Sequence, residues 1–243
     1  IARFARAAAR FEEVLGLPSS GYDVRYDELR EEIRARFAHE DGSWGDGTQT
    51  GLAFAADLRL ADEQGIADLL VAKIAEEDGV LTTGIFGTTL AFDLLNRTGH
   101  SDVVEAWLTR EKAPSYKAML ASGNKALAEQ FVMFLSSYNH AMFSSYLQWF
   151  YQGLAGIRVA DDAVGANHVE LRPYFSTLTN EVSCSFVTRH GEIRTEWSRD
   201  AAGALRFSYE VPSDVRVGLF VPEGVEARSS AICKCLLNVR MVS

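Results

Sequence analysis

PSYKAMLASGNKALAEQFVMFLSSYNHAMFSSYLQW, from Pro114 to Trp149, divides the chain into a part with helical periodicity and a part with strand periodicity. Before this stretch, apolar residues recur every three to four positions, which predicts amphipathic helices; after it the period falls to two, which predicts strands. The stretch itself mixes hydroxyl, amide, carboxyl and imidazole groups with aromatic rings. Such a mixture suits a polyhydroxylated ligand such as a sugar, and solvated turns between helices are the alternative.

Composition and charge exclude several classes of protein. A hydrophobic content of 47% in 243 residues excludes a disordered chain and is enough to build a core. The net charge of -9 argues against nucleic acids and anionic membranes as partners, because phosphate groups bind to clusters of Lys and Arg. No apolar run reaches the roughly 18 residues of a membrane span, and no signal peptide opens the chain. We therefore expect a neutral ligand.

The cysteines and the known cofactor motifs point to no metal and no cofactor. Cys184, Cys233 and Cys235 lack the spacing of a disulfide framework or a zinc site, which favours a reducing compartment such as the cytoplasm over secretion. Asp41 and Asp46 lie in a Gly-rich loop without the spacing of a calcium-binding loop, so turn formation explains them better. The sequence contains no phosphate loop, dinucleotide fingerprint or HExxH motif.

Roughly eight helices with short connections are predicted, which makes neighbouring helices antiparallel hairpins. Thr48 and Asp62 are expected to cap two of them. The glycines near Thr83 are expected to form a tight turn at a helix start, a structural feature. The predicted helices cover about 1–15, 23–37, 48–58, 62–74, 88–96, 101–110, 126–134 and 141–153.

After Gly156 the apolar residues alternate with polar ones, which is typical of strands with one face in water. Turns at 190–191, 200–203 and 212–214 separate the runs, so we expect an antiparallel meander that forms all or part of a β-sandwich. The boundary between the two parts is expected near 156–168. The tail after Glu223 lacks this alternation, and either an edge strand or a non-native end would explain it.

Several segments occur in the same order as in one known enzyme family. They are DGTQT (46–50), LTTGIFGT (81–88), TREKAPSY (109–116), the segment from Ser122 to Glu129, NHAMFSSYLQWFYQGLAGI (139–157) and HVELRPYF (168–175). Together they resemble bacterial α-L-rhamnosidases of glycoside hydrolase family 78, from the first helices to about Glu223. The family hydrolyses terminal α-L-rhamnosides, so the resemblance implies a rhamnose-containing glycoside or glycan as ligand.

The resemblance also implies a multidomain architecture, α then β. It predicts part of an (α/α)6 toroid of helical hairpins over residues 1–160, followed by an antiparallel β-sandwich over 161–243. About eight helices are too few to close a toroid of twelve. The chain therefore resembles the C-terminal part of such an enzyme, and the missing N-terminal half of the same enzyme is its expected partner.

The family uses an inverting mechanism, in which one carboxyl group protonates the leaving oxygen and another activates water. Its general acid lies in an acidic segment that has no counterpart here. Its general base follows a Gly-Ala-Thr-Thr-x-Trp run, and aligning SGNKALAEQF on that run implies Glu129 as the base. Asn124, Lys125 and Ala126 replace Ala-Thr-Thr, and Ala128 replaces the Trp. A nearby Lys125 would lower the pKa of Glu129, which still permits a base role.

Four further residues are candidates for contact with the sugar. Asn139 and His140 match an Asn-His pair of the family, although a His at a helix start can instead bond to backbone. Tyr116 stands where the family has a Trp and is either a stacking platform or a core residue. Trp44 either lines the cavity mouth or packs on a neighbouring helix, and Trp149 is expected in the core. The alternative functions are a catalytically inactive rhamnoside-binding remnant and a structural fragment with exposed apolar faces.

Overall fold

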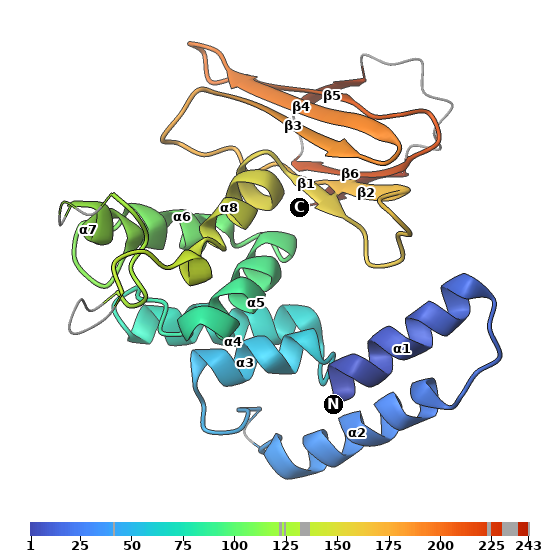
Figure 1. The fold of residues 1–243 in the computed structure, drawn as a ribbon. Coiled ribbons are helices and arrows are strands. Elements are labelled where there is room, and N and C mark those ends of the chain that lie inside the picture. The colour runs from blue at the N-terminus through green and yellow to red at the C-terminus, as the bar shows by residue number, and fades with distance from the viewer. Residues whose placement is uncertain are drawn as a thin grey trace. The chain divides into compact units, whose positions relative to one another are not determined.

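The computed structural model describes residues 1–40, 42–121, 123, 125–131, 137–222, 225–229 and 238–242 (Figure 1). The chain divides into two compact units, Ile1–Ser145 and Tyr146–Ser243. The first is helical and the second consists mainly of strands, as the change of hydrophobic period predicts. No helix in the described part of the chain combines the length and the apolar character needed to cross a membrane.

The helices of the first unit follow one another with short connections. They are α1 (Ala2–Leu15), α2 (Tyr22–Phe37), α3 (Gln49–Asp57), α4 (Glu63–Glu76), α5 (Gly84–Arg97), α6 (Ser101–Thr109), α7 (Tyr116–Ala121) and the 3-10 turn η1 (Ala141–Phe143). The predicted caps are confirmed, because the Thr48 side chain accepts a hydrogen bond from the Gly51 amide and Asp62 accepts one from the Gly65 amide.

Three helix predictions need correction, and one of them is the single helix over 141–153, which is divided into a 3-10 turn at Ala141–Phe143, an α-helix at Tyr146–Gln148 and a π-helix at Trp149–Leu154. The helix predicted from Thr88 begins at Gly84, whose φ of 59° starts the turn that leads into α5. The helix α7 was not predicted. The helix predicted over 126–134 is wrong for 126–131, where the backbone pairs with a later segment instead, and 132–134 lie outside the described residues.

The core of the helical unit lies between α4, α5 and α6. Its fully buried side chains are Ile66, Leu70, Phe92, Leu94, Leu95, Val104 and Trp107. The packing of α3 on α5 is close at Gly87, because an added Cβ atom would lie 2.9 Å from the Thr50 hydroxyl. This close approach explains why a glycine stands inside the first turn of α5.

The side chain of Gln49 joins α3 to the segment that leads into α5. Its Nε2 donates to the Val80 carbonyl at 2.7 Å and to the Glu77 carboxylate at 3.1 Å, and its Oε1 accepts from the Thr82 amide at 3.0 Å. Gln49 is completely buried. The neighbouring Thr50 hydroxyl donates to the Thr83 carbonyl. Two of the sequence motifs, DGTQT and LTTGIFGT, therefore form a single hydrogen-bonded contact.

The antiparallel hairpin of α1 and α2 is fastened to the C-terminal end of α3 by polar side chains. The Tyr26 hydroxyl donates to the Leu58 carbonyl at 3.0 Å, and Arg34 Nε donates to the Leu60 carbonyl at 2.8 Å. Arg30 donates to the Arg59 carbonyl in the same way. Because a helix leaves its last carbonyls without partners and carries partial negative charge there, cationic side chains stabilise this end.

The large apolar residues of α1 point away from α2. Phe4, Phe11 and Leu15 are 82%, 67% and 66% exposed, whereas the alanines Ala2 and Ala5 are buried. The amphipathic stripe seen in the sequence is therefore present but has no covering element among the described residues.

The second unit begins with a short helical segment, α8 (Tyr146–Gln148) followed by the π-helix η2 (Trp149–Leu154). Trp149 is buried, as expected. The strands are β1 (Ile157–Val159), β2 (His168–Leu171), β3 (Glu181–Thr188), β4 (Gly191–Arg199), β5 (Leu205–Glu210), β6 (Arg216–Pro222), β7 (Glu226–Ser229) and β8 (Asn238–Val242).

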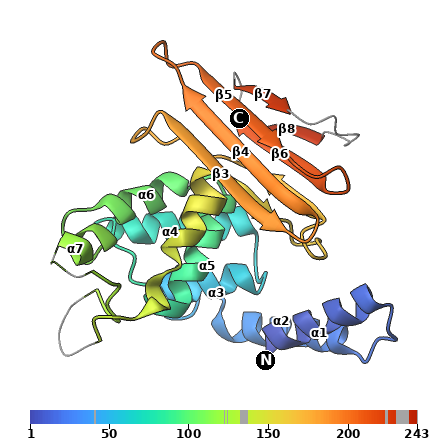
Figure 2. The same cartoon turned by 45° about the horizontal axis from the view of Figure 1, so that its top comes forward.

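Two four-stranded sheets, in the orders β1-β2-β6-β8 and β3-β4-β5-β7, enclose one core (Figure 2). Buried residues of both sheets contact one another there, among them Val169 and Leu219 from the first sheet and Trp197 and Phe207 from the second. The predicted sandwich is confirmed. The expected antiparallel meander holds for β3, β4 and β5, but β2 and β6, β5 and β7, and β6 and β8 pair in parallel. The reason is that β6 crosses into the other sheet instead of forming a hairpin with β5.

The sandwich also binds the helical segment that precedes it. Trp197 Nε1 donates to the Leu154 carbonyl and the Thr195 hydroxyl donates to the Ala155 carbonyl, both at 2.9 Å. Gly156 lies between this segment and β1 with a φ of 73°, and an added Cβ atom would lie 2.2 Å from the Pro173 nitrogen. Only a glycine fits this position.

Replacing Gln49 by Leu should lower the free energy of unfolding by about 3 kcal/mol, because the Val80 carbonyl and the Thr82 amide would lose their buried partner. Urea unfolding would measure the change. Gln64 is exposed on α4, so Gln64→Leu is the matched control and should change stability by no more than about 0.5 kcal/mol. Equal effects of the two substitutions would contradict a structural role for Gln49.

The turn between β5 and β6 should show a carboxyl-dependent contribution to stability. Asp214 accepts a hydrogen bond from His190 Nδ1 at 2.6 Å, and this bond lowers the pKa of the carboxyl group. A lowered folded-state pKa stabilises the protein above the unfolded pKa of about 3.9, and this contribution is lost as pH falls through the folded value. Asp214→Asn should therefore lower the melting temperature at pH 7, and the difference from the wild type should shrink toward pH 3. A difference independent of pH would argue against the bond.

Candidate functional site

The segment that carries most of the predicted site residues folds back on itself. The Glu129 amide donates to the Ser137 carbonyl at 2.9 Å, and the His140 amide donates to the Leu127 carbonyl at 2.6 Å. These two bonds lay residues 127–129 beside residues 137–140. The backbone of Glu129 thereby lies beside the segment that contains Asn139 and His140. These two residues follow Glu129 by ten and eleven positions in the sequence.

The carboxylate of Glu129 is fixed at one of its two oxygens. Oε2 accepts a hydrogen bond from the Ser137 amide at 3.1 Å, and the residue is half-buried. Oε1 makes no hydrogen bond to another described residue. A carboxylate held at one oxygen and open at the other can accept a proton from a bound water, which is the task of a general base.

The two residues that follow the return of the chain have different surroundings. Asn139 is exposed, and its amide donates to the Ser137 hydroxyl at 3.3 Å. His140 is half-buried, and its Nδ1 is buried without a hydrogen-bond partner in the described part of the chain. The His140 side chain makes no capping hydrogen bond at the start of η1, so the alternative in which it bonds to backbone there is not supported. Contact of both residues with sugar stays a prediction.

A cluster of aromatic rings lies beneath this segment. The ring of Phe131 lies 5.0 Å from that of Trp107, 5.1 Å from that of Tyr116 and 4.4 Å from that of Phe143, measured between centroids. Trp107 and Tyr116 are 5.2 Å apart in an edge-to-face arrangement. The cluster anchors both ends of the returning segment, since Phe131 follows Glu129 closely and Phe143 follows His140.

Tyr116 belongs to this cluster. Its ring is buried, and its hydroxyl donates to the Phe143 carbonyl at 2.5 Å. These contacts favour the alternative in which Tyr116 is a core residue. The tyrosine thereby fixes η1, which directly follows His140. Ala128 is also fully buried, with its amide 3.3 Å from the Met119 sulfur, so this position provides no aromatic surface beside Glu129.

Trp44 lies in a different part of the helical unit, in the loop between α2 and α3. It is buried and pairs with Ala38 in an isolated bridge, which agrees with the packing alternative. It also lines an apolar pocket of about 540 Å³ together with Phe37, Phe54 and Leu58. The described residues that line this pocket all lie between Ile33 and Leu60, apart in the sequence from the segment of Glu129.

Asp46, in the Gly-rich loop between α2 and α3, is hydrogen-bonded within its own turn. Asp46 accepts hydrogen bonds from the Thr48 hydroxyl at 2.8 Å and from the Thr48 amide at 3.2 Å, and these bonds lower the pKa of the carboxyl group. The carboxylate therefore serves the turn before α3, as expected; Asp41 lies outside the described residues. No group of three His, Cys, Asp or Glu side chains in the described part of the chain is placed to hold a metal ion.

Sequence reasoning missed two contributors to this region. The Ser137 amide, which fixes the Glu129 carboxylate, is a backbone group and leaves no signal in the sequence. Phe131 occupies the centre of the aromatic cluster, and its signal, an aromatic residue two positions after a candidate base, is indistinguishable from that of a helix core residue.

Comparison with protein families matches both units. The family model described as the bacterial alpha-L-rhamnosidase 6 hairpin glycosidase domain matches residues 1–154. The bacterial alpha-L-rhamnosidase C-terminal domain matches residues 156–232.

Individual relatives carry the same name. An alpha-L-rhamnosidase of Streptomyces avermitilis is 26% identical over 91% of this chain, and one of Alteromonas sp. is 28% identical over 83%. The chain spans only 22% and 23% of the length of these two relatives.

Solved structures agree in fold. The crystal structure of the Streptomyces avermitilis enzyme complexed with L-rhamnose superposes with a TM-score of 0.82 at 25% identity, over 91% of this chain and 22% of that one. The alpha-L-rhamnosidase of Aspergillus terreus superposes with a TM-score of 0.76 at 24% identity, over 91% of this chain and 26% of that one. The six-hairpin family model matches well over half of the residues of this chain. The chain therefore belongs to the bacterial α-L-rhamnosidase six-hairpin glycosidase family.

Proposed function

We propose that this chain is the C-terminal part of an inverting α-L-rhamnosidase and that Glu129 is its general base. The observation that carries the proposal is the return of the chain, in which the segment of Asn139 and His140 runs beside that of Glu129 and the Ser137 amide donates to the half-buried Glu129 carboxylate. In this role Glu129 takes a proton from the water that attacks the anomeric carbon of a terminal α-L-rhamnoside. A relative of this chain has been crystallised with L-rhamnose, which supports the choice of sugar.

The polar residues beside Glu129 suit contact with the sugar ring. The side-chain amide of Asn139 both donates and accepts hydrogen bonds, and the His140 ring can donate to or accept from a hydroxyl. Tyr116 contributes indirectly, because its hydroxyl fixes the Phe143 carbonyl after His140. Trp44 is kept as a candidate for contact with the substrate farther from the reacting bond, since its ring lines a pocket rather than the Glu129 segment.

The general acid has to come from outside this chain. Inversion needs two carboxyl groups roughly 6.5–9.5 Å apart on opposite faces of the sugar, and the sequence offers no counterpart of the acid-bearing segment. We infer that a longer polypeptide, of which these residues are the C-terminal part, supplies it. The share of the relatives that this chain spans, 22–23%, fits that inference.

The catalytic proposal predicts the effect of one substitution. In the polypeptide that contains both carboxyl groups, Glu129→Gln should lower kcat for a chromogenic α-L-rhamnoside by about 10²–10⁴-fold, the usual contribution of a general base. Glu76→Gln is the matched control, since Glu76 is an exposed residue of α4 paired with Lys73, and it should leave kcat unchanged. Turnover of Glu129→Gln within a few-fold of the wild type would remove Glu129 from the mechanism.

A second function, rhamnoside binding without hydrolysis, is favoured by one observation. Ala128 is buried and leaves Glu129 without the aromatic wall that would stack on the sugar and desolvate the carboxylate. If the wild-type polypeptide shows no turnover while calorimetry shows that L-rhamnose binds, this function replaces the first. If L-rhamnose does not bind either, both functions fail and a structural role is left.

The exposed stripe of α1 is the surface on which we expect the preceding helical hairpins to pack. Three large side chains separated by helical spacing, Phe4, Phe11 and Leu15, form a continuous apolar face on one side of α1. A six-hairpin domain packs each hairpin against its neighbours, so an uncovered apolar stripe on the first helix fits a neighbour contributed by the same enzyme. By itself, a chain with such a face should associate with other copies.

Charge on this stripe should therefore suppress self-association of the 243-residue chain. The double substitution Phe4→Glu and Phe11→Glu should weaken association at least about tenfold in analytical ultracentrifugation, because each Phe buries apolar surface in a contact. The double substitution Ser19→Glu and Ser20→Glu adds the same charge in the exposed loop after α1 and should have little effect. If both double variants associate as the wild type does, the stripe is not a contact surface.

A further inference from the structure

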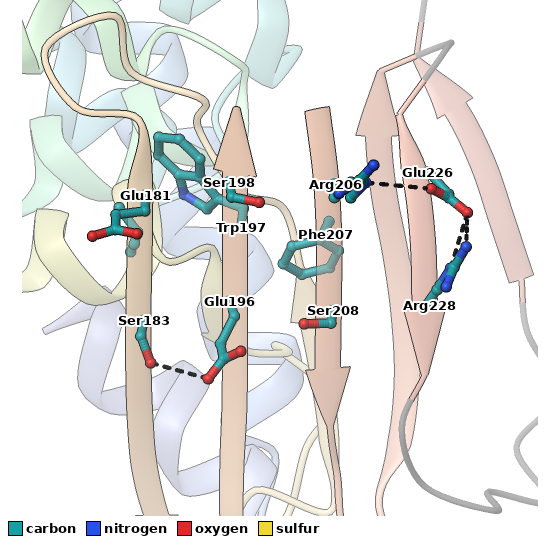
Figure 3. A pocket seen from close by; sticks show the side chains of 11 residues that line it. Glu181, Ser183, Glu196, Trp197, Ser198, Arg206, Phe207, Ser208, Glu226 and Arg228 are labelled. Atoms are coloured by element: carbon teal, nitrogen blue, oxygen red, sulfur yellow. Dashed lines mark hydrogen bonds and ion pairs between the residues drawn. The ribbon is translucent and has the colours of Figure 1, made fainter. Parts of the chain in front are cut away.

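The outer face of the sheet formed by β3, β4, β5 and β7 carries an organised set of polar side chains. Along β4 and β5 the alternate residues Ile193, Trp197, Phe207 and Tyr209 are buried in the core of the sandwich. The residues between them point to the other face of the sheet. Figure 3 shows Glu196, Ser198 and Ser208 on that face, with the rings of Trp197 and Phe207 behind them.

The register of the sheet places these residues in rows across the strands. One row runs from Ser183 on β3 through Glu196 and Ser208 to Arg228 on β7. The next row runs from Glu181 through Ser198 and Arg206 to Glu226. In each row a short serine side chain, Ser208 or Ser198, stands between two long charged ones and leaves a low point there.

These rows enclose a groove of about 630 Å³. A second hollow of about 150 Å³ continues it along β4 and β5, and the two share Glu196 and Ser208 in their linings. Arg194 and Glu210, which are paired across β4 and β5, border the far end. Three rows extend about 13 Å along the strands, since a strand rises about 3.3 Å per residue, which is longer than a single sugar ring.

The groove contains charges of both signs on different strands. Glu181 and Glu196 stand on β3 and β4, and Arg206 and Arg228 stand on β5 and β7. Both arginines contact Glu226, Arg206 with Nε at 3.8 Å and Arg228 with Nε at 2.9 Å. On the other side the Ser183 hydroxyl donates to Glu196 at 3.3 Å. The groove therefore offers carboxylate acceptors on β3 and β4, and guanidinium donors together with the Glu226 carboxylate on β5 and β7.

We propose that this groove binds a neutral oligosaccharide. A sugar hydroxyl donates to a carboxylate and accepts from a guanidinium, so a neutral polyol can use both sides of the groove and the serine hydroxyls between them. An anion would meet Glu181, Glu196 and Glu226, and a cation would meet the two arginines. An extended peptide gains its affinity from the backbone of a strand edge, whereas this face presents side chains.

The groove is a site separate from the proposed hydrolysis, because none of the residues that line the groove takes part in that reaction. It holds a glycan chain rather than the reacting bond. The described lining offers the core-facing rings of Trp197 and Phe207 and no exposed aromatic face for stacking, so the affinity is weak, with a Kd of about 1 mM.

An NMR titration of the whole chain tests the site. The probes are two neutral tetrasaccharides, one of α-linked L-rhamnose and cellotetraose, and the acidic tetragalacturonic acid. At least one neutral probe should shift the amide signals of Ser183, Ser198 and Ser208 and saturate in the millimolar range. Ser208→Tyr should fill the groove and weaken binding at least about tenfold, while the sheet tolerates a Tyr because aromatic residues favour strands.

Val187→Tyr is the matched control, since Val187 is exposed on the same face of β3, one row beyond the groove and its continuation, and this variant should bind as the wild type does. Absence of a saturable shift with either neutral probe overturns the proposal. So does unchanged binding by Ser208→Tyr, or stronger binding of tetragalacturonic acid. Because Glu129→Gln should bind these probes as the wild type does, failure of the catalytic proposal and failure of this one can be told apart.

Discussion

The packing of the rings of Trp107, Tyr116, Phe131 and Phe143, edge-to-face except for the tilted pair of Phe131 and Phe143, is the constraint on which the candidate site depends. Residues 125–131 and 137–140, which include Glu129, form neither helix nor strand, so no regular secondary structure fixes their backbone conformation. Each aromatic pair contributes about 0.5–1.5 kcal/mol beyond its buried area, and the four rings occupy both sides of the returning chain. The packing of these rings therefore helps to fix the backbone that carries the Glu129 carboxylate.

Parts of the fold that depend on local sequence could be predicted, whereas parts that depend on packing between distant residues could not. The helices α1 to α4 and α6 were expected close to their observed ranges, because apolar spacing and the caps Thr48 and Asp62 act locally. The segment ALAEQF has equally strong helix formers, yet it is not helical. Intrinsic propensity amounts to tenths of a kcal/mol per residue, which the burial of Phe131 and the backbone bonds of Glu129 and His140 outweigh.

In the strands, too, the local features could be predicted and the pairing of distant segments could not. Alternation in β4 and β5 identifies the buried face correctly, since Ile193, Trp197 and Phe207 all lie in the core. The parallel pairing of β2 with β6 joins residues far apart in the chain and leaves no local pattern. For the site, the family motif led to Glu129 and its neighbours, but a sequence cannot tell that Tyr116 is buried or that Trp44 lines another pocket.

The bonds from Thr195 and Trp197 to the chain at Ala155 and Leu154 span 40 and 43 residues. Residues up to 154 match the six-hairpin domain, so the last helical segment of that domain is held by side chains that are made later. During synthesis on the ribosome this segment emerges well before its partners. Its final hydrogen bonds can form only after β4 has left the exit tunnel. The order of translation thus separates the synthesis of this segment from the formation of its two bonds to β4.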